Sequence, residues 1–554
     1  MSVYETQFWK KSYHWRTKLD QIIPKTPAYY ILRDHSMFYP DKAATWFYGA
    51  EITFDELYLK CTRLANVLVE NGIKKGDRVG LLMPNCPQFV ISYWAVLMAG
   101  AIVVNMNPLY TTDELRHLFD DSGITGLITY DATIPVIKPL CKEFNVPTVI
   151  VTKLTDFMPI GKVSTPEELG LEPGWLHFSQ ILDTTERFAP PLVEIDGDDP
   201  AVIQYTGGTT GLPKGAILTQ YNLTAVAMTL YQWTVDKTER TPVENRRVFC
   251  TIPFFHVYGE SCCICWATFA NATMVILPRF DVDEVFNTIN SFDTFLYWPA
   301  VPTMIQALFY HPRVKEVNWH RKFAYAGSGA APASEALIKR CRQYDFNFYE
   351  GFGMSETAAT GISTPTCKLK PMSIGIPFPN VDIRLVDDDE NDVPLGEPGE
   401  IWLKSPSVMK GYWNNPEATA NSLTEDGWLK TGDIAYMDED GYIFIVDRTK
   451  DIIITGGFNV YPREVDEVLI KHPKVADVIT IGIPDEYRGE AVKSFVQLDS
   501  DQQATEEELI AFCREHLTPY KVPRTIEFRS ELPRTNTGKA LRRVLREEEM
   551  KKGK

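Results

Sequence analysis

Helical and strand-like hydrophobic patterns alternate along the first part of the chain. Residues 57–68 carry apolar side chains at helical spacing, directly after a capping box at 53–56. Short apolar runs at 78–83 and 126–130 are typical of strands, and 112–122 has a helical pattern between them. This alternation predicts an α/β fold in which helices cover a largely parallel sheet.

The longest apolar stretch, residues 89–106, is nearly free of polar side chains. Gly100 interrupts it, and β-branched residues crowd its second half. We therefore expect a buried helix over 88–99 and a buried strand over 101–105, and no transmembrane segment. The N-terminus has no apolar region of the kind found in a secretory signal.

Three glycine-rich segments lie at the ends of apolar runs, at 203–215, 323–332 and 346–356. A helix over 221–233 and strands over 249–255, 273–277 and 294–298 are predicted between them. Loops at the carboxyl ends of strands form the ligand crevice of open α/β sheets. We therefore expect the three segments to share one site. Residues 150–197 have a less regular pattern of apolar and polar residues, so we expect an irregular segment on the surface of the protein.

The first glycine-rich segment contains four glycines, three threonines and Lys214. Its backbone N–H groups, hydroxyls and ammonium group suit a polyphosphate, and the alternative is a plain surface turn. It is not the P-loop of the NTPases, because Lys214 lies between Pro213 and Gly215 instead of preceding Ser or Thr.

From about residue 380 the sequence pattern changes to short apolar runs separated by turn residues, which predicts a small β-rich subdomain. A linker at 448–451 joins it to a last segment with helices and strands, at 462–471, 475–483, 491–498, 505–516 and 525–528. We predict a large N-terminal domain of helix-covered sheets plus the β-rich subdomain (1–447), a hinge (448–451) and a small α+β C-terminal domain (452–554).

Composition excludes some classes of function. The balance of 56 basic against 73 acidic residues gives a net charge of −17, which argues against a nucleic-acid partner. The ten cysteines are scattered, which suits reduced thiols and a cytoplasmic protein. Cys262, Cys263 and Cys265 cluster without a matching Cys or His pair, so we expect them to pack in the core instead of binding a metal.

Taken together, the chain resembles the adenylate-forming superfamily, which includes acyl-CoA synthetases, peptide-synthetase adenylation domains and firefly-type luciferases. The resemblance covers residues 40–545. Its motifs occur in order at 205–215 (YTGGTTGLPKG), 349–356 (YEGFGMSE), 399–402 (GEIW), 408–413 (VMKGYW), 431–433 (TGD), 447–448 (DR), 456–462 (GGFNVYP) and 533–539 (PRTNTGK).

The resemblance implies a two-step reaction. A carboxylic acid and ATP form an acyl-AMP and pyrophosphate, and a thiol, here CoA, then takes the acyl group. Mg²⁺ would be held by Glu356 and the hydroxyl of Thr206, which are hard oxygen ligands. The residues implied in ATP or AMP binding are Thr206, Gly207, Gly208, Thr209, Thr210, Gly211, Lys214, Gly329, Ala330, Ala331, Glu350, Gly351, Phe352, Gly353, Ser355, Asp433 and Arg448.

The remaining roles follow from the same resemblance. Lys539 and His256 would be catalytic, with a solvated lysine and a core histidine as the plain alternatives. Lys450 matches the hinge of a mobile C-terminal domain. The CoA loop would be Gly456, Gly457 and Phe458, and the acyl pocket His256, Tyr258, Tyr325 and Gly327.

Departures from the family pattern bear on the substrate. Ser355 replaces a common Thr, and Phe352 a common Tyr, so stacking remains without a phenolic hydrogen bond. No Asp lies near His256 to pair an α-ammonium group, which favours an apolar acid. The Trp found beyond this His in some long-chain relatives is absent, which puts a long alkyl tunnel in doubt.

These observations predict an AMP-forming acyl-CoA synthetase, monomeric or homodimeric. A medium- or long-chain fatty acid is the first expectation for its substrate, and an aromatic or alicyclic acid the next. The alternatives are an acyl-AMP ligase that loads a carrier-protein thiol, a luciferase-like oxidase and a non-catalytic ATP or acyl sensor. Lys539 argues against a sensor, which would not need it.

Overall fold

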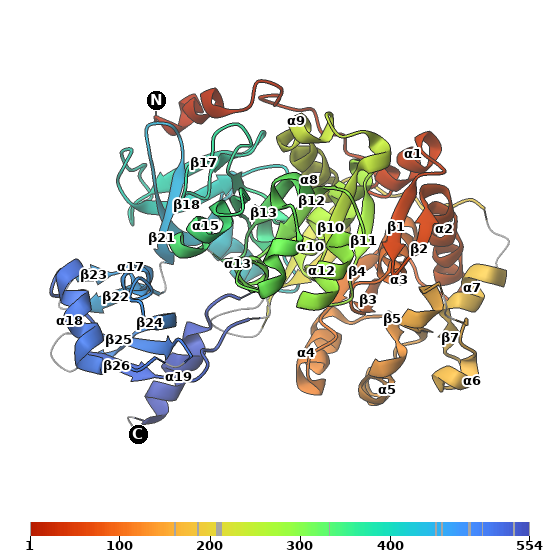
Figure 1. The fold of residues 1–554 in the computed structure, drawn as a ribbon. Helices are drawn as coiled ribbons and strands as arrows, with labels where there is room; N and C mark the ends of the chain where they lie inside the picture. The colour runs from red at the N-terminus through yellow and green to blue at the C-terminus, as the bar shows by residue number, and fades with distance from the viewer. Residues whose placement is uncertain are drawn as a thin grey trace.

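The computed structural model describes residues 2–159, 162–184, 188–206, 213–331, 333–448, 451–455, 458–485, 489–500, 502–535 and 538–552. These residues form a large N-terminal domain and a small C-terminal domain, with the C-terminal domain at the lower left of Figure 1. The predicted mixed α/β architecture is confirmed.

One sheet of the N-terminal domain holds the first glycine-rich segment between two of its strands. Within the described residues it has eight strands, in the order β19-β9-β8-β4-β3-β5-β6-β7. Their bounds are β3 Arg78–Leu82, β4 Ile102–Met106, β5 Gly126–Tyr130, β6 Thr148–Thr152, β7 Leu176–His177, β8 Pro200–Tyr205, β9 Gly215–Thr219 and β19 Gly411–Tyr412. The strands from β8 to β7 pair in parallel, whereas β9 is antiparallel to β8 and to β19.

The second sheet carries the other two glycine-rich junctions. Its order, among the described strands, is β16-β15-β14-β13-β12-β10-β11-β1-β2. The bounds are β1 Ala43–Phe47, β2 Ala50–Thr53, β10 Arg247–Cys250, β11 Thr273–Ile276, β12 Phe295–Ala300, β13 Phe323–Ser328, β14 Tyr349–Phe352, β15 Ile362–Ser363 and β16 Ile376–Pro377. Strands β12, β13 and β14 are parallel, so their carboxyl ends meet at one edge.

Helices cover both sheets and fill the space between them. Helix α3 (Pro87–Met98) is buried along its whole length and contacts β1 of one sheet and β3 and β4 of the other. The other helices of this domain are α1 Tyr30–Phe38, α2 Phe54–Glu70, α4 Thr112–Ser122, α5 Ile134–Glu143, α6 Pro166–Leu169, α7 Phe178–Thr184, α8 Gln220–Trp233, α9 Val235–Thr238, α10 Val257–Gly259, α11 Trp266–Phe269, α12 Val282–Asn290, α13 Pro302–Phe309, α14 Trp319–Lys322, α15 Glu335–Arg342 and α16 Pro416–Ser422.

The β-rich subdomain is a separate antiparallel sheet, as predicted. Its described strands, in spatial order, are β17 Asp382–Val386, β18 Gly399–Lys404, β20 Leu429–Met437 and β21 Ile443–Arg448. The hydrophobic core under this sheet also includes Trp9 and Tyr13 from the N-terminal arm of the chain. The arm therefore contributes to the subdomain that precedes the predicted hinge.

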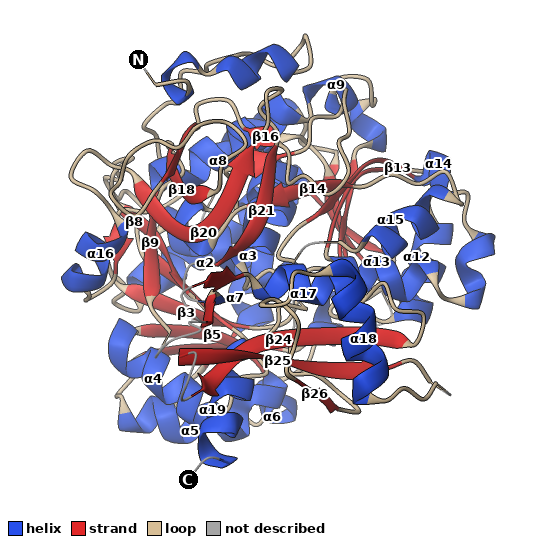
Figure 2. Cartoon of the chain, turned by 90° about the vertical axis from the view of Figure 1, so that its left-hand side faces the viewer, coloured by secondary structure: helices blue, strands red, loops and turns tan. Residues whose placement is uncertain are grey.

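The C-terminal domain has its own sheet and its own hydrophobic core. Its described strands are β22 Ile453–Thr455, β23 Phe458–Val460, β24 Val475–Asp485, β25 Gly489–Leu498 and β26 Thr525–Phe528, and its helices are α17 Pro462–Leu469, α18 Glu506–His516 and α19 Arg542–Lys552. Figure 2 shows α17 between β24 of this domain and β21 of the N-terminal domain, and both contacts are present.

Three expectations need correction. The strand predicted over 249–255 ends at Cys250, because Pro253 lacks the N–H that a ladder requires. The Gly-rich segment joins antiparallel strands β8 and β9, and the sequence pattern did not reveal β9. Residues 150–197 are not wholly an excursion, because β7 pairs with β6 at the sheet edge.

The expectation that the three neighbouring cysteines pack in the core is confirmed by the described residues. No helix among them is long and apolar enough to cross a membrane. Cys262, Cys263 and Cys265 are buried in the π-helix η6 (Glu260–Cys265), and the described part of the chain holds no cluster of His, Cys, Asp or Glu able to bind a metal on its own.

Candidate active site

A cavity of about 2240 Å³ lies between the two domains. Its walls contain every predicted site residue whose side chain the structure describes. From the N-terminal domain these are Thr206, Lys214, His256, Tyr258, Tyr325, Gly327, Gly329, Ala330, Ala331, Glu350, Gly351, Phe352, Gly353, Ser355, Glu356 and Asp433, and from the C-terminal domain Lys539.

The carboxyl ends of β13 and β14 form one wall of the cavity. Gly327 pairs with Tyr349 in register, and Ala330 follows in the left-handed conformation at φ 67°. A Cβ on Gly353 would lie 2.3 Å from the backbone of Ala359, so the chain after Phe352 can fold this tightly only with glycine. The tight turn holds the ring of Phe352 at the cavity.

Glu350 lies beside this wall and is mostly buried. Its Oε1 accepts a hydrogen bond from the Ala333 N–H at 3.0 Å. Burial raises the pKa of Glu350 to about 7, although that N–H and the charge of Arg463 favour the ionised form. Arg463 belongs to the C-terminal domain, so the two domains interact electrostatically next to the predicted nucleotide site.

Asp433 and Arg448 lie directly opposite each other on the antiparallel strands β20 and β21. The side chain of Asp433 is buried, and its N–H donates to Thr431 Oγ1 at 3.2 Å. The register therefore brings together two residues that the motifs predicted to share a ribose. The side chain of Arg448 lies outside the described residues.

Glu356 meets a tyrosine that the sequence analysis did not identify. The Tyr412 hydroxyl donates to Glu356 Oε1 at 2.6 Å, and the Lys214 ammonium lies 5.3 Å from the centre of the Tyr412 ring. Glu356 also lines the same cavity as Thr206 and Lys214. One carboxylate oxygen beside a phosphate loop fits Mg²⁺, which takes its other ligands from phosphates and water.

His256 is a neutral hydrogen-bond donor in this site. Its Nδ1 accepts from the Tyr258 N–H at 3.2 Å, so the ring proton lies on Nε2. Burial, and then the charge of Lys539, lowers the pKa of His256 to about 4. The imidazole is therefore uncharged at neutral pH, and its Nε2–H can donate to an anion without adding a charge.

Lys539 reaches the cavity on a turn of the C-terminal domain. Gly538 has φ 80° and lies so near Thr303 of α13 that a Cβ there would be 2.9 Å from the threonine methyl. The Thr535 N–H donates to the Lys539 carbonyl at 2.8 Å, and Arg534 donates to the Gly538 carbonyl at 2.9 Å. Gly538 therefore lies against α13 of the N-terminal domain, and Lys539 beside it lines the cavity.

An apolar compartment continues from His256 into the N-terminal domain. Gly327 borders it, where a Cβ would lie 2.8 Å from the Tyr297 hydroxyl. The Tyr325 and Tyr349 rings stack beside it at 4.8 Å. The cavity is also lined by apolar residues that the motifs did not indicate: Leu230, Trp233, Trp266, Ile362, Ile374 and Phe378. The apolar face of α8 was the available signal for Leu230 and Trp233.

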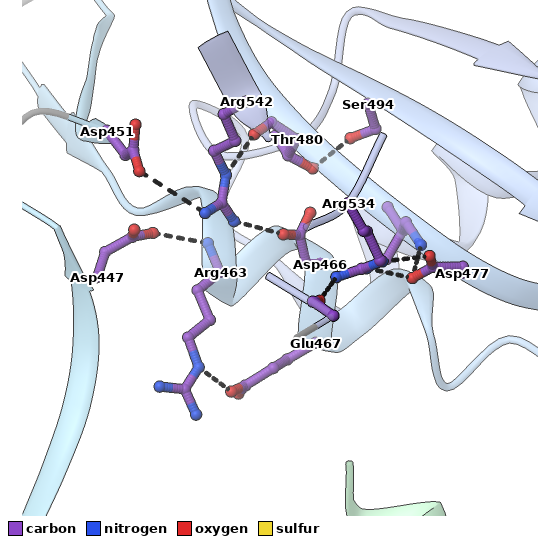
Figure 3. Close-up of polar contacts among 12 residues, drawn as sticks. Asp447, Asp451, Arg463, Asp466, Glu467, Asp477, Thr480, Ser494, Arg534 and Arg542 are labelled. Carbon is purple, nitrogen blue, oxygen red and sulfur yellow. Dashed lines mark hydrogen bonds and ion pairs between the residues drawn. The ribbon is translucent and has the colours of Figure 1, made fainter. Parts of the chain in front are cut away.

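Charged side chains connect the domains around the predicted hinge (Figure 3). Arg463 of α17 donates its N–H to Asp447 Oδ2 at 2.7 Å and its Nη1 to the Ile445 carbonyl at 3.0 Å. Within the C-terminal domain, Arg542 of α19 donates to Asp466 of α17 at 2.8 Å. Burial raises the pKa of Asp466 to about 6 against the opposing charge of Arg542. No motif had indicated these contacts.

Some predicted residues lie outside the described part of the chain. These are Gly207, Gly208, Thr209, Thr210 and Gly211 of the phosphate loop, Lys450 of the hinge, and Gly456 and Gly457 of the CoA loop. Phe458 begins β23, but its side chain is not described.

Comparisons with known proteins agree with this geometry. Residues 32–413 match the family model of the AMP-binding enzymes, and residues 464–539 match the C-terminal domain of the same enzymes. The chain belongs to the AMP-binding enzyme family. Within that family it is 40% identical to a long-chain-fatty-acid–CoA ligase of Bacillus subtilis (strain 168), over 95% of each chain.

Solved structures add information on the domain arrangement. ATP-bound MatB from Rhodopseudomonas palustris has a TM-score of 0.83 at 28% identity, over 95% of this chain and 99% of MatB. Apo MatB has a TM-score of 0.74 at 29% identity, over the same shares of the two chains. The closed arrangement of this protein is thus more similar to the ATP-bound form.

Proposed function

We propose that this protein is an AMP-forming acyl-CoA ligase that activates an apolar carboxylic acid with ATP and transfers the acyl group to CoA. One observation carries the proposal. A neutral donor, His256, and a cation, Lys539, face the same cavity where an apolar compartment meets the buried carboxylate of Asp433. His256 and Lys539 suit the binding of a carboxylate, and the Asp433 carboxylate suits the ribose hydroxyls of a nucleotide.

The first step joins two anions. A carboxylate oxygen of the acid attacks the α-phosphorus of ATP, the bond from that phosphorus to the bridging oxygen breaks, and pyrophosphate leaves with the electron pair. Lys539 stabilises the charge that develops between the two reactants. His256 donates its Nε2–H to the carboxylate of the acid. Because the imidazole is neutral, it orients this carboxylate without adding a charge to the site.

The nucleotide is held by groups around the cavity. Thr206, Lys214 and the loop between them bind the β- and γ-phosphates. Phe352 stacks on the adenine, while Asp433 and Arg448 bind the ribose. When bound, Mg²⁺ would be held by the Glu356 carboxylate and the Thr206 hydroxyl, and it would compensate the negative charge of the phosphates.

The second step requires a different arrangement of the domains. The CoA thiol releases its proton to water, its sulfur attacks the acyl carbon, the bond from that carbon to the phosphate oxygen breaks, and AMP leaves with the electron pair. We propose that residues 452–554 rotate about the hinge 448–451, withdraw Lys539, and bring Gly456, Gly457 and Phe458 to the site. The likeness to ATP-bound MatB supports assigning the closed arrangement to the first step.

A medium- or long-chain fatty acid is the proposed substrate. The cavity is lined by apolar side chains that include Tyr258, Trp233 and Phe378, which suits an alkyl chain. The 40% identity to a long-chain-fatty-acid–CoA ligase supports the same class.

A screen of pyrophosphate release tests the proposal. Saturated acids of increasing chain length, together with ring acids, are supplied with ATP and Mg²⁺, with and without CoA. We expect release with fatty acids and CoA-dependent formation of the thioester. Release without any thioester would instead indicate a ligase that serves another thiol, and no release with any acid would refute the activity.

A further inference from the structure

Glu260 is a carboxyl group that the proposed reaction does not use, although it lies just behind the acid-binding segment. Its side chain is fully buried, at 0% exposure, and it is the first residue of the π-helix η6. Turns of π-helix are rare and are frequent at functional sites. Burial of a carboxyl group costs free energy unless hydrogen-bond partners compensate for the lost water, so Glu260 requires such partners.

Two donors satisfy this carboxyl group. The Tyr93 hydroxyl donates to Oε1 at 3.1 Å, and the Asn105 amide donates to Oε2. Tyr93 comes from α3 and Asn105 from β4. The Glu260 carboxylate therefore contacts two elements that are far from η6 in the sequence. Burial raises the pKa of Glu260 to about 7, against the effect of these two hydrogen bonds.

The hydrogen bonds continue into a ring around His256. Asn105 Nδ2 also donates to Gln204 Oε1 at 2.9 Å, and Gln204 Nε2 donates to the Phe255 carbonyl at 3.0 Å. The Glu260 N–H donates to the His256 carbonyl at 3.0 Å, which closes the ring. Asn105, Gln204 and Phe255 line the same cavity as His256.

The ring connects two parts of the proposed reaction. Gln204 is on β8, two residues before Thr206, where the phosphate loop begins. Phe255 and His256 belong to the segment that meets the acid. Gly259 constrains this segment further, since a Cβ there would lie 2.0 Å from the Pro253 carbonyl oxygen. The distance between the acid and the phosphates therefore depends on this network.

We propose that Glu260 is a positioning residue: through Asn105 and Gln204 it fixes the Phe255–His256 backbone relative to the strand that carries the phosphate loop. The inference rests on the proposed function and deepens it. Misplacement of one reactant by about 1 Å can lower a rate about 100-fold. The role is geometric, so it depends on the acceptors of Glu260 and not on its charge.

Glutamine and leucine at position 260 separate geometry from charge. In Glu260→Gln, Oε1 can accept from Asn105 while Nε2 donates to Tyr93, because a phenol oxygen both donates and accepts. The ring then survives without the charge. Glu260→Leu also removes the charge, and with it the acceptor that Tyr93 and Asn105 share, so the ring is opened. Gln204→Met removes the hydrogen bonds to Asn105 and to the Phe255 carbonyl, and it leaves the hydrogen bonds of Glu260 with Tyr93 and Asn105 in place.

The experiment measures the adenylation half-reaction by pyrophosphate exchange, the Kd for ATP, and Tm. We expect Glu260→Leu and Gln204→Met to lower kcat about 10- to 100-fold with the Kd for ATP within about twofold. Glu260→Gln should recover most of the rate that Glu260→Leu loses. The double variant Glu260→Leu/Gln204→Met should lose no more than either single one, because both open the same ring.

A control variant identifies a merely structural effect. Asn66 of α2 is buried and bonded to the Thr62 and Ala189 carbonyls, so Asn66→Ala should lower Tm without changing kcat. The proposal is overturned if Glu260→Gln is as slow as Glu260→Leu, if Gln204→Met has the wild-type kcat, or if kcat follows Tm across all variants. Failure of the proposed function is distinct, since the wild type would then show no exchange with any acid.

Discussion

Arg463 is expected to hold the two domains in the arrangement needed for the first step. It lies on α17, after the predicted hinge, and its guanidinium donates to the Ile445 carbonyl on β21, before the hinge. Its Nε also donates to Glu467 at 2.9 Å, and the Arg463 side chain is only 16% exposed. The contact with Ile445 exists in the closed arrangement and must break if the C-terminal domain rotates.

The size of the effect follows from this contact. A hydrogen bond from a charged donor contributes about 1.5–3 kcal/mol. Because the bond to Ile445 favours only the closed arrangement, Arg463→Ala should shift the equilibrium between the closed and rotated arrangements about 10- to 100-fold. The Arg463 N–H to Asp447 remains in this variant, so closure is weakened and not abolished.

The two half-reactions measure the shift separately. We expect kcat/KM for ATP in pyrophosphate exchange to fall in proportion to the closed population, by up to about 10- to 100-fold. Thioester formation from supplied acyl-AMP should keep its rate or become faster, because the rotated arrangement is favoured. The control is Arg524→Ala, which removes a half-exposed ion pair with Asp485 inside the C-terminal domain and should change neither rate.

Two outcomes would refute this reasoning. An equal loss in both half-reactions would mean that Arg463 supports the fold of the domain and not its position. Unchanged pyrophosphate exchange would mean that the bond to Ile445 does not bias the equilibrium.

Four further predictions follow from individual contacts. Lys539→Ala should lower adenylation about 100- to 1000-fold and spare thioester formation from acyl-AMP, because the ammonium acts on charge that develops in the first step; equal loss of both would contradict its role. Asp433→Ala should raise the Kd for ATP but not for the acid in calorimetry, and an unchanged Kd for ATP would exclude the ribose contact. Tyr412→Phe should lower the free energy of unfolding by about 1–3 kcal/mol in urea, because the buried Glu356 loses a donor; equal stability would show that Glu356 finds another donor. Burial disfavours ionised Glu527, but ion pairs led by Lys493 prevail and lower its pKa from 4.5 to about 2. This stabilisation is complete above pH 4.5 and is lost as the pH falls toward 2, so Glu527→Gln should flatten that part of the stability–pH curve; an unchanged slope would reject the assignment.

Much of the fold was predictable because it depends on local patterns. Helix α3 and strand β4 follow from one apolar stretch that a glycine interrupts, and they form within a residue or two of the expected bounds. Strand β9 was missed because it is short and lies between the glycine-rich segment and the cap of α8. Strand β10 was predicted too long because apolar residues continue into a turn that Pro253 begins.

The site, too, was predictable only in part. The sequence alone determined which residues are suited to phosphate, ribose and carboxylate chemistry, since its motifs place those residue types at fixed spacings. Every one of them whose side chain is described lies on one cavity. Only the tertiary structure decided their partners: Tyr412 on Glu356, Arg463 across the hinge, and the ring from Glu260 through Asn105 to Gln204. Spacing along the chain cannot encode these contacts, because they depend on the order of strands in the sheets and on where the C-terminal domain closes.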